Sequence, residues 1–275
     1  MPRATLAREV ARLKARKPSV LRSAVPPDRV EFTRRLLGIE PDDWQADFLT
    51  SDATQVLMNC SRQAGKSTVA AIRTLHEALT KPGSLTLVLA PAERQAQELF
   101  SKVAGFYGQL AQRAPSPDSD RKSGMALANG SRIEALPGSS DRTVRGFSGV
   151  SLLIVDEAAR VLDDLYFAIR PMLAVSRGTL MMLSTPYGKR GVFYEAWTGA
   201  EEWDRYEVPA TGCPRISAAF LAEERRSLPE WVFRQEYLCS FEETEDAVFT
   251  TEMVDGAVSP DVKPLFEANA PRGAA

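Results

Sequence analysis

The segment Cys60-Ser61-Arg62-Gln63-Ala64-Gly65-Lys66-Ser67-Thr68 decides the fold. An apolar run, residues 55–59, precedes it, and a helical pattern follows it as far as Leu79. A strand, a tight loop ending in Gly-Lys-Ser and a helix form a cradle for phosphate, because backbone N–H groups and the helix N-terminus face the anion. In such a cradle the Lys66 ammonium reaches the β- and γ-phosphates, and the Ser67 hydroxyl binds Mg²⁺. We therefore predict that a nucleotide contacts Ser61, Arg62, Gln63, Ala64, Gly65, Lys66, Ser67 and Thr68.

This loop departs from the full pattern G-x-x-x-x-G-K-[ST], which has a glycine where Cys60 stands. Taken alone, Ala-Gly-Lys-Ser could be a chance surface turn. A second motif favours the nucleotide interpretation: the apolar run 151–155 ends in Asp156-Glu157. Lys66 and Asp156 are 90 residues apart, which leaves room for the intervening strands and helices of a nucleotide-binding sheet.

The composition is that of an ordinary globular protein, with 275 residues, 44% hydrophobic and 25% charged. No apolar run approaches membrane-spanning length, and the N-terminus lacks the apolar centre of a secretory signal. The three cysteines are odd in number and far apart, which suits a reducing cytoplasm and excludes a disulfide framework. The single histidine, His76, excludes histidine-based metal sites and is expected to be a surface or packing residue. We expect a cytoplasmic protein with no membrane partner.

The formal net charge of −2 conceals an uneven distribution. Residues 1–35 contain only three acidic side chains, and the C-terminal end of the chain is acidic. A basic arm can contact nucleic acid or an acidic partner, but the pattern favours the solvated face of an amphipathic helix. The basic residues of this arm are Arg3, Arg8, Arg12, Lys14, Arg16, Lys17, Arg22, Arg29, Arg34 and Arg35.

Strand and helix patterns alternate along most of the chain. Buried strands are predicted at 84–90, 151–156 and 179–184, and another strand at 203–208, with helices between them. This alternation predicts an α/β fold, a P-loop NTPase with a mostly parallel sheet and helices on both faces. A helical pair, 218–227 and 230–238, predicts a small lid at the C-terminal end. The expected divisions are an arm at 1–39, an ATPase core at 40–210, a helical lid or linker at 211–249, and a disordered tail at 250–275.

Smaller features are expected within this pattern. Asp28 is predicted to cap a helix that runs to Leu37, and Pro41 to lie in the first turn of the next helix. Residues 113–124 are predicted to be an exposed loop, and the Asn129-Gly130 pair to form the turn of a hairpin. The stretch 163–174 is predicted to be helical in spite of Pro171.

The two motifs divide the chemistry of ATP hydrolysis between them. Lys66 and a Mg²⁺ ion held by Ser67 and Asp156 neutralise the phosphates, and Glu157 is placed to orient or deprotonate the attacking water. An adjacent Asp-Glu pair separates the metal and water roles, which favours an ATP hydrolase over a small-molecule phosphotransferase. Arg145, Arg142 or Arg62 could stabilise charge at the γ-phosphate, and Thr185 could sense that phosphate. On spacing alone, Gln45 is an ordinary helix residue or a contact for the adenine edge.

Together these residues resemble the ATPase domain of the large terminase subunit, the DNA-packaging motor of tailed bacteriophages, over roughly residues 40–250. The resemblance implies adenine contact by Gln45, a finger function for Arg145 on a neighbouring subunit, and coupling by Ser184 and Thr185. It also makes Cys60 less unusual, since the family's loop commonly reads Arg-Gln-x-Gly-Lys-Ser. The motifs that carry the resemblance are Trp44-Gln45-Ala46-Asp47-Phe48, Arg62–Ser67, Arg145-Gly146, Ser184-Thr185-Pro186, Gln235-Glu236-Tyr237 with Phe241, and Ala247-Val248-Phe249.

The resemblance further implies an activity and a set of partners. The activity is Mg²⁺-dependent ATP hydrolysis that drives double-stranded viral DNA into a procapsid, in a homo-oligomeric ring that works with a portal protein and a small terminase subunit. Too short a stretch follows Phe249 for a ribonuclease H-like domain, so no nuclease activity is expected in this chain. The alternatives are another P-loop DNA-dependent ATPase or a helicase-like motor, and a nucleotide-binding scaffold without turnover.

Overall fold

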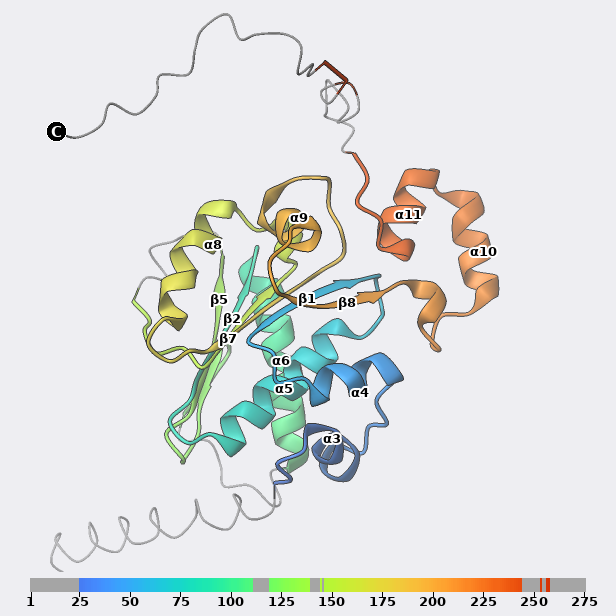
Figure 1. Ribbon diagram of the computed structural model, residues 1–275. Helices are drawn as coiled ribbons and strands as arrows, with labels where there is room; N and C mark the ends of the chain where they lie inside the picture. The colour runs from blue at the N-terminus through green and yellow to red at the C-terminus, as the bar shows by residue number, and fades with distance from the viewer. Residues whose placement is uncertain are drawn as a thin grey trace, which may run out of the picture. The chain divides into compact units, whose positions relative to one another are not determined.

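The computed structural model describes residues 25–110, 119–138, 144, 146–243, 253, 256 and 257 (Figure 1). The chain divides into two compact units, residues 1–242 and 243–275. The sheet, the helices and the candidate site all belong to the first unit. The finer divisions expected at residues 40 and 211 stay predictions, and the basic segment before residue 25 lies outside the described residues.

An eight-stranded sheet in the order β3-β4-β5-β2-β6-β7-β1-β8 forms the centre of this unit. All pairs from β5 to β8 are parallel, and only the β3–β4 and β4–β5 pairs are antiparallel. This arrangement confirms the predicted α/β fold. The strands are β1 Gln55–Cys60, β2 Leu85–Ala90, β3 Ser119–Arg121, β4 Gly124–Ala126, β5 Arg132–Pro137, β6 Leu152–Asp156, β7 Thr179–Ser184 and β8 Asp204–Val208.

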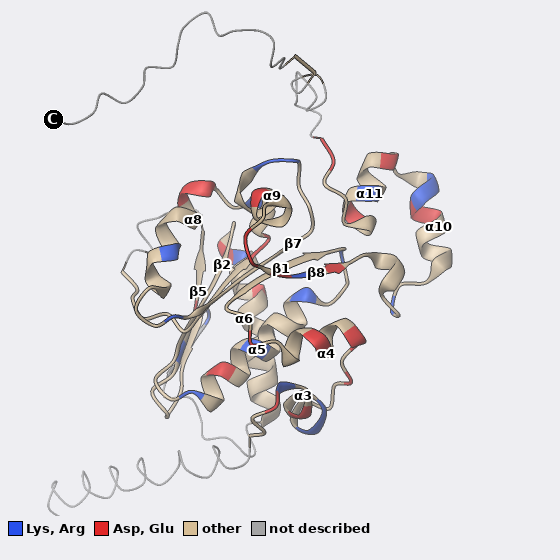
Figure 2. Cartoon of the chain, viewed as in Figure 1, with Lys and Arg blue, Asp and Glu red and all other residues tan. Residues whose placement is uncertain are grey.

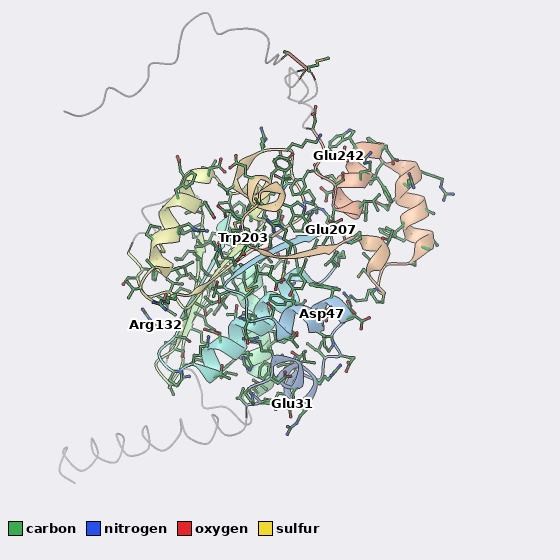
Figure 3. The ribbon with its side chains drawn as sticks, viewed as in Figure 1. Glu31, Asp47, Arg132, Trp203, Glu207 and Glu242 are labelled. Carbon is green, nitrogen blue, oxygen red and sulfur yellow. The ribbon has the colours of Figure 1, made fainter. Side chains whose placement is uncertain are left out.

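Helices cover both faces of the sheet because alternate strand residues are apolar on opposite sides. In β6, Leu152 and Ile154 pack in one hydrophobic cluster with the helices α3 to α6, whereas Leu153 and Val155 pack in a second cluster with α8 and α9 (Figure 1). Trp203, labelled in Figure 3, belongs to the second cluster. The helices are α3 Arg29–Leu37, α4 Asp43–Thr50, α5 Lys66–Thr80, α6 Glu93–Leu110, α8 Asp163–Ile169, α9 Gly191–Thr198, α10 Ala218–Ser227 and α11 Glu230–Leu238, with 3₁₀ turns η1 Ala158–Arg160, η2 Arg170–Leu173 and η3 Ala210–Gly212.

Most predicted elements are confirmed, and three differ. α4 begins at Asp43 with Asp42 as its N-cap, so Pro41 precedes the cap rather than entering the first turn. The expected loop at 113–124 contains β3, which pairs with β4 and widens the sheet. The helical stretch through Pro171 is a true α-helix only to Ile169 and then tightens into η2, because proline has no N–H for the next helical bond.

The N-terminal helix α3 is anchored in the core. Asp28 caps it by accepting a hydrogen bond from Glu31 N at 2.6 Å, as the sequence predicts. Phe32 is fully buried and makes an edge contact with the ring of His76, at 5.2 Å between centroids. His76 Nε2 lies 2.9 Å from Pro26 O, which makes the single histidine a packing residue.

Replacement of Phe32 by alanine should lower the free energy of unfolding by about 3–5 kcal/mol, because it leaves a cavity in the core. Urea unfolding followed by circular dichroism would measure this loss. Phe167→Ala is the matched control, since that ring is 65% exposed on α8 and its removal should have little effect. Equal losses in both variants would contradict the packing described for α3.

Candidate active site

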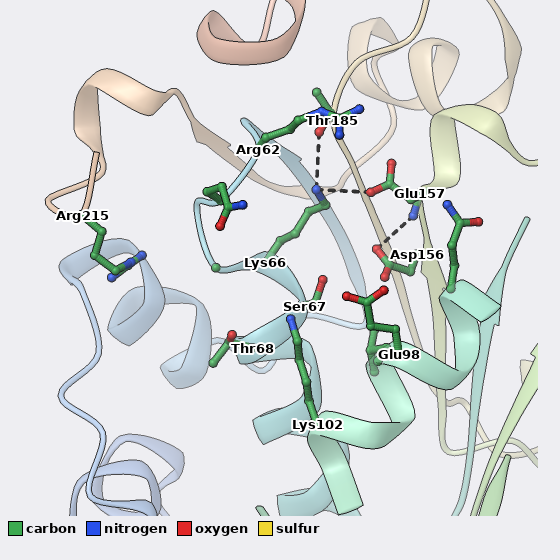
Figure 4. Close-up of a pocket in the computed structure, with 14 residues that line it drawn as sticks. Arg62, Lys66, Ser67, Thr68, Glu98, Lys102, Asp156, Glu157, Thr185 and Arg215 are labelled. Carbon is green, nitrogen blue, oxygen red and sulfur yellow. Dashed lines mark hydrogen bonds and ion pairs between the residues drawn. The ribbon is translucent and has the colours of Figure 1, made fainter. Parts of the chain in front are cut away.

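The candidate site lies where β1, β6 and β7 end at the same edge of the sheet. Asn59 pairs with Ser184 across β1 and β7, and Asp156 pairs with Leu183 across β6 and β7. The three segments that follow these strand ends surround a pocket of about 550 Å³ (Figure 4). The predicted residues that line it are Arg62, Gln63, Gly65, Lys66, Ser67, Thr68, Asp156, Glu157 and Thr185.

The phosphate loop has a backbone that only glycine suits at one position. Gly65 has φ +102° and ψ 11°, and a Cβ there would lie 2.7 Å from Gln45 Nε2. Gln63 is also left-handed, at φ +63°. Cys60, in contrast, is the last residue of β1 and pairs with Val208 of β8. A side chain is therefore tolerated where the full motif has its first glycine.

Two predicted side chains converge on the ammonium group of Lys66. Lys66 Nζ lies 3.4 Å from Glu157 Oε1 and donates a hydrogen bond to Thr185 Oγ1, also at 3.4 Å (dashed lines in Figure 4). The Lys66 side chain is only 11% exposed. The ends of β6 and β7 and the start of α5 thus meet at the mouth of the loop.

The two acidic residues point in different directions. Glu157 adopts a left-handed backbone, φ 51° and ψ 42°, which turns it out of the β6 strand. Its N–H donates to Asp156 Oδ1 at 3.0 Å. The pKa of Asp156 is raised to about 6, mainly by burial and secondly by the neighbouring Glu157 carboxylate. Lys66 lowers this pKa, but its effect is smaller than either of these. The site therefore offers too little positive charge to offset the burial of the Asp156 carboxylate.

The donors at this position fit a hard divalent cation. Asp156 makes no ion pair with a described basic residue, and its carboxylate faces the same pocket as the Ser67 hydroxyl. Among the residues that the structure describes, no group of three or more His, Cys, Asp or Glu side chains could enclose a metal. One carboxylate and one hydroxyl suit Mg²⁺, which keeps water and substrate phosphate oxygens as its other ligands.

Ser184 and Thr185 link the acidic segment to the phosphate loop. Ser184 is fully buried; its hydroxyl donates to Thr185 O at 2.7 Å and accepts from Ala159 N at 3.2 Å. These bonds tie η1, which follows Glu157, to the end of β7. Thr185 in turn contacts Lys66, so the three strand ends form one polar network.

Other predicted residues take different places. Gln45 is buried, accepts a hydrogen bond from Asp42 N at 3.0 Å and lies beside Gly65, so its adenine contact stays a prediction. Ser61 and Ala64 are buried within the loop and do not line the pocket. Arg62 is 64% exposed and forms an ion pair with Glu236, which raises the pKa of Arg62. Arg142 and Arg145 lie outside the described residues.

The pocket also contains residues that the sequence did not indicate. Glu98 and Lys102 project from α6 into the pocket (Figure 4), and Arg215 reaches it from the segment before α10. The i, i+4 spacing of Glu98 and Lys102 on a helix after a buried strand was the only available signal. Gln95 and Leu99 complete the lining.

Fold and site together define a class of protein. A phosphate loop follows β1, an acidic pair follows β6, and an additional strand, β7, lies between these two. Glu157 directly follows the aspartate at the end of β6. This arrangement is that of the P-loop NTPases of the additional-strand, catalytic-glutamate type. No helix of the described residues is long and apolar enough to cross a membrane.

The chain belongs to the family described as "Terminase large subunit, T4likevirus-type, N-terminal", whose model matches residues 57–255. It is 26% identical to the large terminase subunit of Thermus virus P23-45 over 253 residues, which covers 78% of this chain and 51% of that protein. The chain thus spans about half the length of the curated relatives it matches.

Solved structures of large terminases share the fold. The large terminase ATPase domain of Thermus phage P74-26 matches with a TM-score of 0.69 and 24% identity, over 77% of this chain and 98% of that one. The large terminase of a thermophilic bacteriophage, solved in complex with ADP, matches with a TM-score of 0.60 and 13% identity, over 73% of this chain and 54% of that one.

The raised pKa of Asp156 gives a pH dependence in protein free of nucleotide and Mg²⁺. Its ordinary value is 3.8, so the folded state holds this proton more tightly than the unfolded state. The protonated Asp156 carboxyl therefore stabilises the folded state fully below about pH 4, and this contribution to the free energy of unfolding is lost as the pH rises through about 6. Relative to wild type, Asp156→Asn should therefore gain up to about 3 kcal/mol of unfolding free energy between pH 4 and pH 7. Urea unfolding across this range would measure it, and a difference independent of pH would contradict it.

Proposed function

We propose that this chain binds and hydrolyses ATP with Mg²⁺, as the ATPase of a viral DNA-packaging motor. The observation that carries the proposal is the convergence of Lys66, Glu157 and Thr185 at the mouth of a phosphate loop. Membership of the large terminase family, and the ADP complex of the thermophilic bacteriophage protein with the same fold, support it.

Each residue has a role that its place in the site suggests. Lys66 and the loop N–H groups would bind the β- and γ-phosphates, and Ser67 and Asp156 would hold Mg²⁺. When bound, this ion would neutralise charge on the phosphate oxygens. Glu157 is 25% exposed and its left-handed backbone turns it out of β6, and it would take a proton from the attacking water. The Glu157 carboxylate lies 3.4 Å from the Lys66 ammonium, so a phosphate bound by Lys66 would compete with Glu157 for that ammonium.

Completion of the site by a second copy is part of the proposal. Arg62 is already paired with Glu236, which makes it less suited to the γ-phosphate. Arg145 is the preferred finger, with Arg142 as the alternative, and the family resemblance is the basis for placing Arg145 on a neighbouring subunit. The chain would then act as a homo-oligomeric ring, with Ser184 and Thr185 coupling hydrolysis to movement.

The proposed substrate of the motor is double-stranded DNA, moved into a procapsid in the host cytoplasm with a portal protein and a small terminase subunit. This part of the proposal rests on the family alone. Basic and acidic residues are interspersed over the described elements in Figure 2 and the net charge is −2, so the charge distribution gives no separate support for DNA binding. The nucleotide site and the DNA function are therefore separable proposals.

Glu157→Gln should lower the steady-state rate of ATP hydrolysis by about 10²-fold or more, because the amide cannot accept the proton of the attacking water. Binding of a fluorescent ATP analogue should persist in the same variant. Glu223→Gln, an exposed change on α10, is the matched control and should keep the wild-type rate. Unchanged turnover in Glu157→Gln would favour a nucleotide-binding scaffold instead.

Arg145→Ala should remove the dependence of specific ATPase activity on protein concentration and lower the rate by about 10³-fold or more, if a neighbour supplies the finger. The measurement is a titration of enzyme concentration with and without duplex DNA. Addition of Glu157→Gln subunits, which keep Arg145, should restore activity to Arg145→Ala subunits. A fully active Arg145→Ala with flat concentration dependence would move the role to Arg142 or Arg62.

A further inference from the structure

The outer side of the phosphate loop is held by the end of β8 and by the segment that follows this strand. Ser61 N donates to Val208 O at 2.9 Å, and Arg62 N donates to Glu236 O at 3.2 Å. Just before the loop, Asn59 Nδ2 donates to Cys239 O at 2.8 Å. The end of β1 and the start of the loop are therefore bonded both to β8 and to the C-terminal helical part of the first unit.

Arg215 makes the contact nearest to the phosphate-binding side. Its Nη2 donates to Ala64 O at 2.8 Å, and its Nη1 lies 2.9 Å from Asp42 Oδ1 and 2.8 Å from Asp42 Oδ2. The planar guanidinium thus joins the N-cap of α4 to the loop in a fixed geometry. Asp42 in turn donates its N–H to Gln45, whose side chain occupies the space that a Cβ at position 65 would need.

The bond to Ala64 O fixes the direction of one peptide group. The described chain contains no cis peptide bond, and in a trans peptide the C=O and the following N–H point to opposite sides. Because Ala64 O points outward to Arg215, Gly65 N–H points to the other side, into the loop. In the described part of the chain, Gln63, Ala64 and Gly65 donate no backbone N–H to a protein acceptor. These are the donors that a concave anion site requires.

We propose that Arg215 is a positioning residue of the nucleotide site: it holds the Ala64–Gly65 peptide from outside, so that Gly65 N–H is presented to a phosphate oxygen. This inference rests on the proposed binding of a nucleoside triphosphate at the loop. It makes the recognition of phosphate depend on a residue that lies 151 positions along the chain from Ala64. The effect reaches the ligand through the backbone, with no contact between the guanidinium and the base.

A direct contact of Arg215 with the base is the competing explanation, since Arg215 lines the pocket. The two explanations differ for a ligand that has no base. If Arg215 acts through the loop, its loss weakens the binding of inorganic tripolyphosphate and of ADP by the same factor. If Arg215 contacts the base, its loss weakens ADP and leaves tripolyphosphate unchanged.

The experiment measures binding of a fluorescent ADP analogue, and its displacement by unlabelled ADP and by tripolyphosphate, for the full chain and four variants. Arg215→Gln should weaken both ligands about 10-fold, the effect of losing a hydrogen bond from a charged group. The affinity of Arg215→Lys should lie between those of Arg215→Gln and wild type, because one ammonium can reach only one of the two partners, Asp42 and Ala64 O. Arg225→Gln is the control, since Arg225 forms an exposed ion pair with Glu230 at 3.1 Å on the neighbouring helices. Lys66→Ala should abolish binding.

The outcomes separate the inference from the proposed function. Wild-type binding that depends on Lys66 supports the nucleotide site, and equal losses for both ligands in Arg215→Gln support the positioning role. Unchanged affinity in Arg215→Gln, or a loss for ADP alone, would overturn the positioning role and leave the nucleotide site standing. Failure of the wild type to bind either ligand would overturn both. Matching circular dichroism spectra and unfolding midpoints of the variants exclude a loss of fold.

Discussion

Parallel pairing of β1, β7 and β6 is the constraint on which the site depends. It brings three strand ends to one edge, so that Lys66, Thr185 and Glu157 meet although they come from distant parts of the sequence. Side chains alternate between the two faces of a strand, so a slip of one residue in this register would reverse every core contact. The apolar alternation that packs helices on both faces therefore also determines the position of the polar groups at the edge.

This edge combines buried charge with a strained backbone. Asp156 is buried next to Glu157, and Glu157 and Gln63 adopt left-handed conformations that cost non-glycine residues about 1–3 kcal/mol each. Such local costs persist only where the surrounding structure outweighs them, and here the two packed hydrophobic clusters do so. Counter-charge supplied by a bound ligand would relieve the electrostatic part of the cost. Relief of this cost on binding would favour the nucleotide binding proposed for this site.

The sequence was informative wherever local chemistry and periodicity decide the structure. The alternating strands, the glycine at position 65 and the acidic pair after a buried strand were sufficient to predict the α/β fold and the residues around Lys66. Arg215 was not predictable, because its partners Asp42 and Ala64 are 173 and 151 residues away and no local pattern encodes such contacts. β3 was missed for a related reason: its three residues gain strand structure only by pairing with β4. Cys60 departed from the full motif, and the reason lies in the structure, where its extended backbone pairs with Val208 of β8.

The burial of the cysteines has a practical consequence for spectroscopy. Cys60, Cys213 and Cys239 are all buried, and burial raises the pKa of Cys60 well above its usual range and that of Cys239 to about 12. Thiol-reactive dyes attack the exposed thiolate, so the folded protein offers them a poor target at neutral pH. A cysteine introduced on the solvent side of α10 would be labelled selectively without removal of the native thiols. The distance between α10 and a fluorescent nucleotide could then be followed by energy transfer through the proposed cycle of ATP hydrolysis.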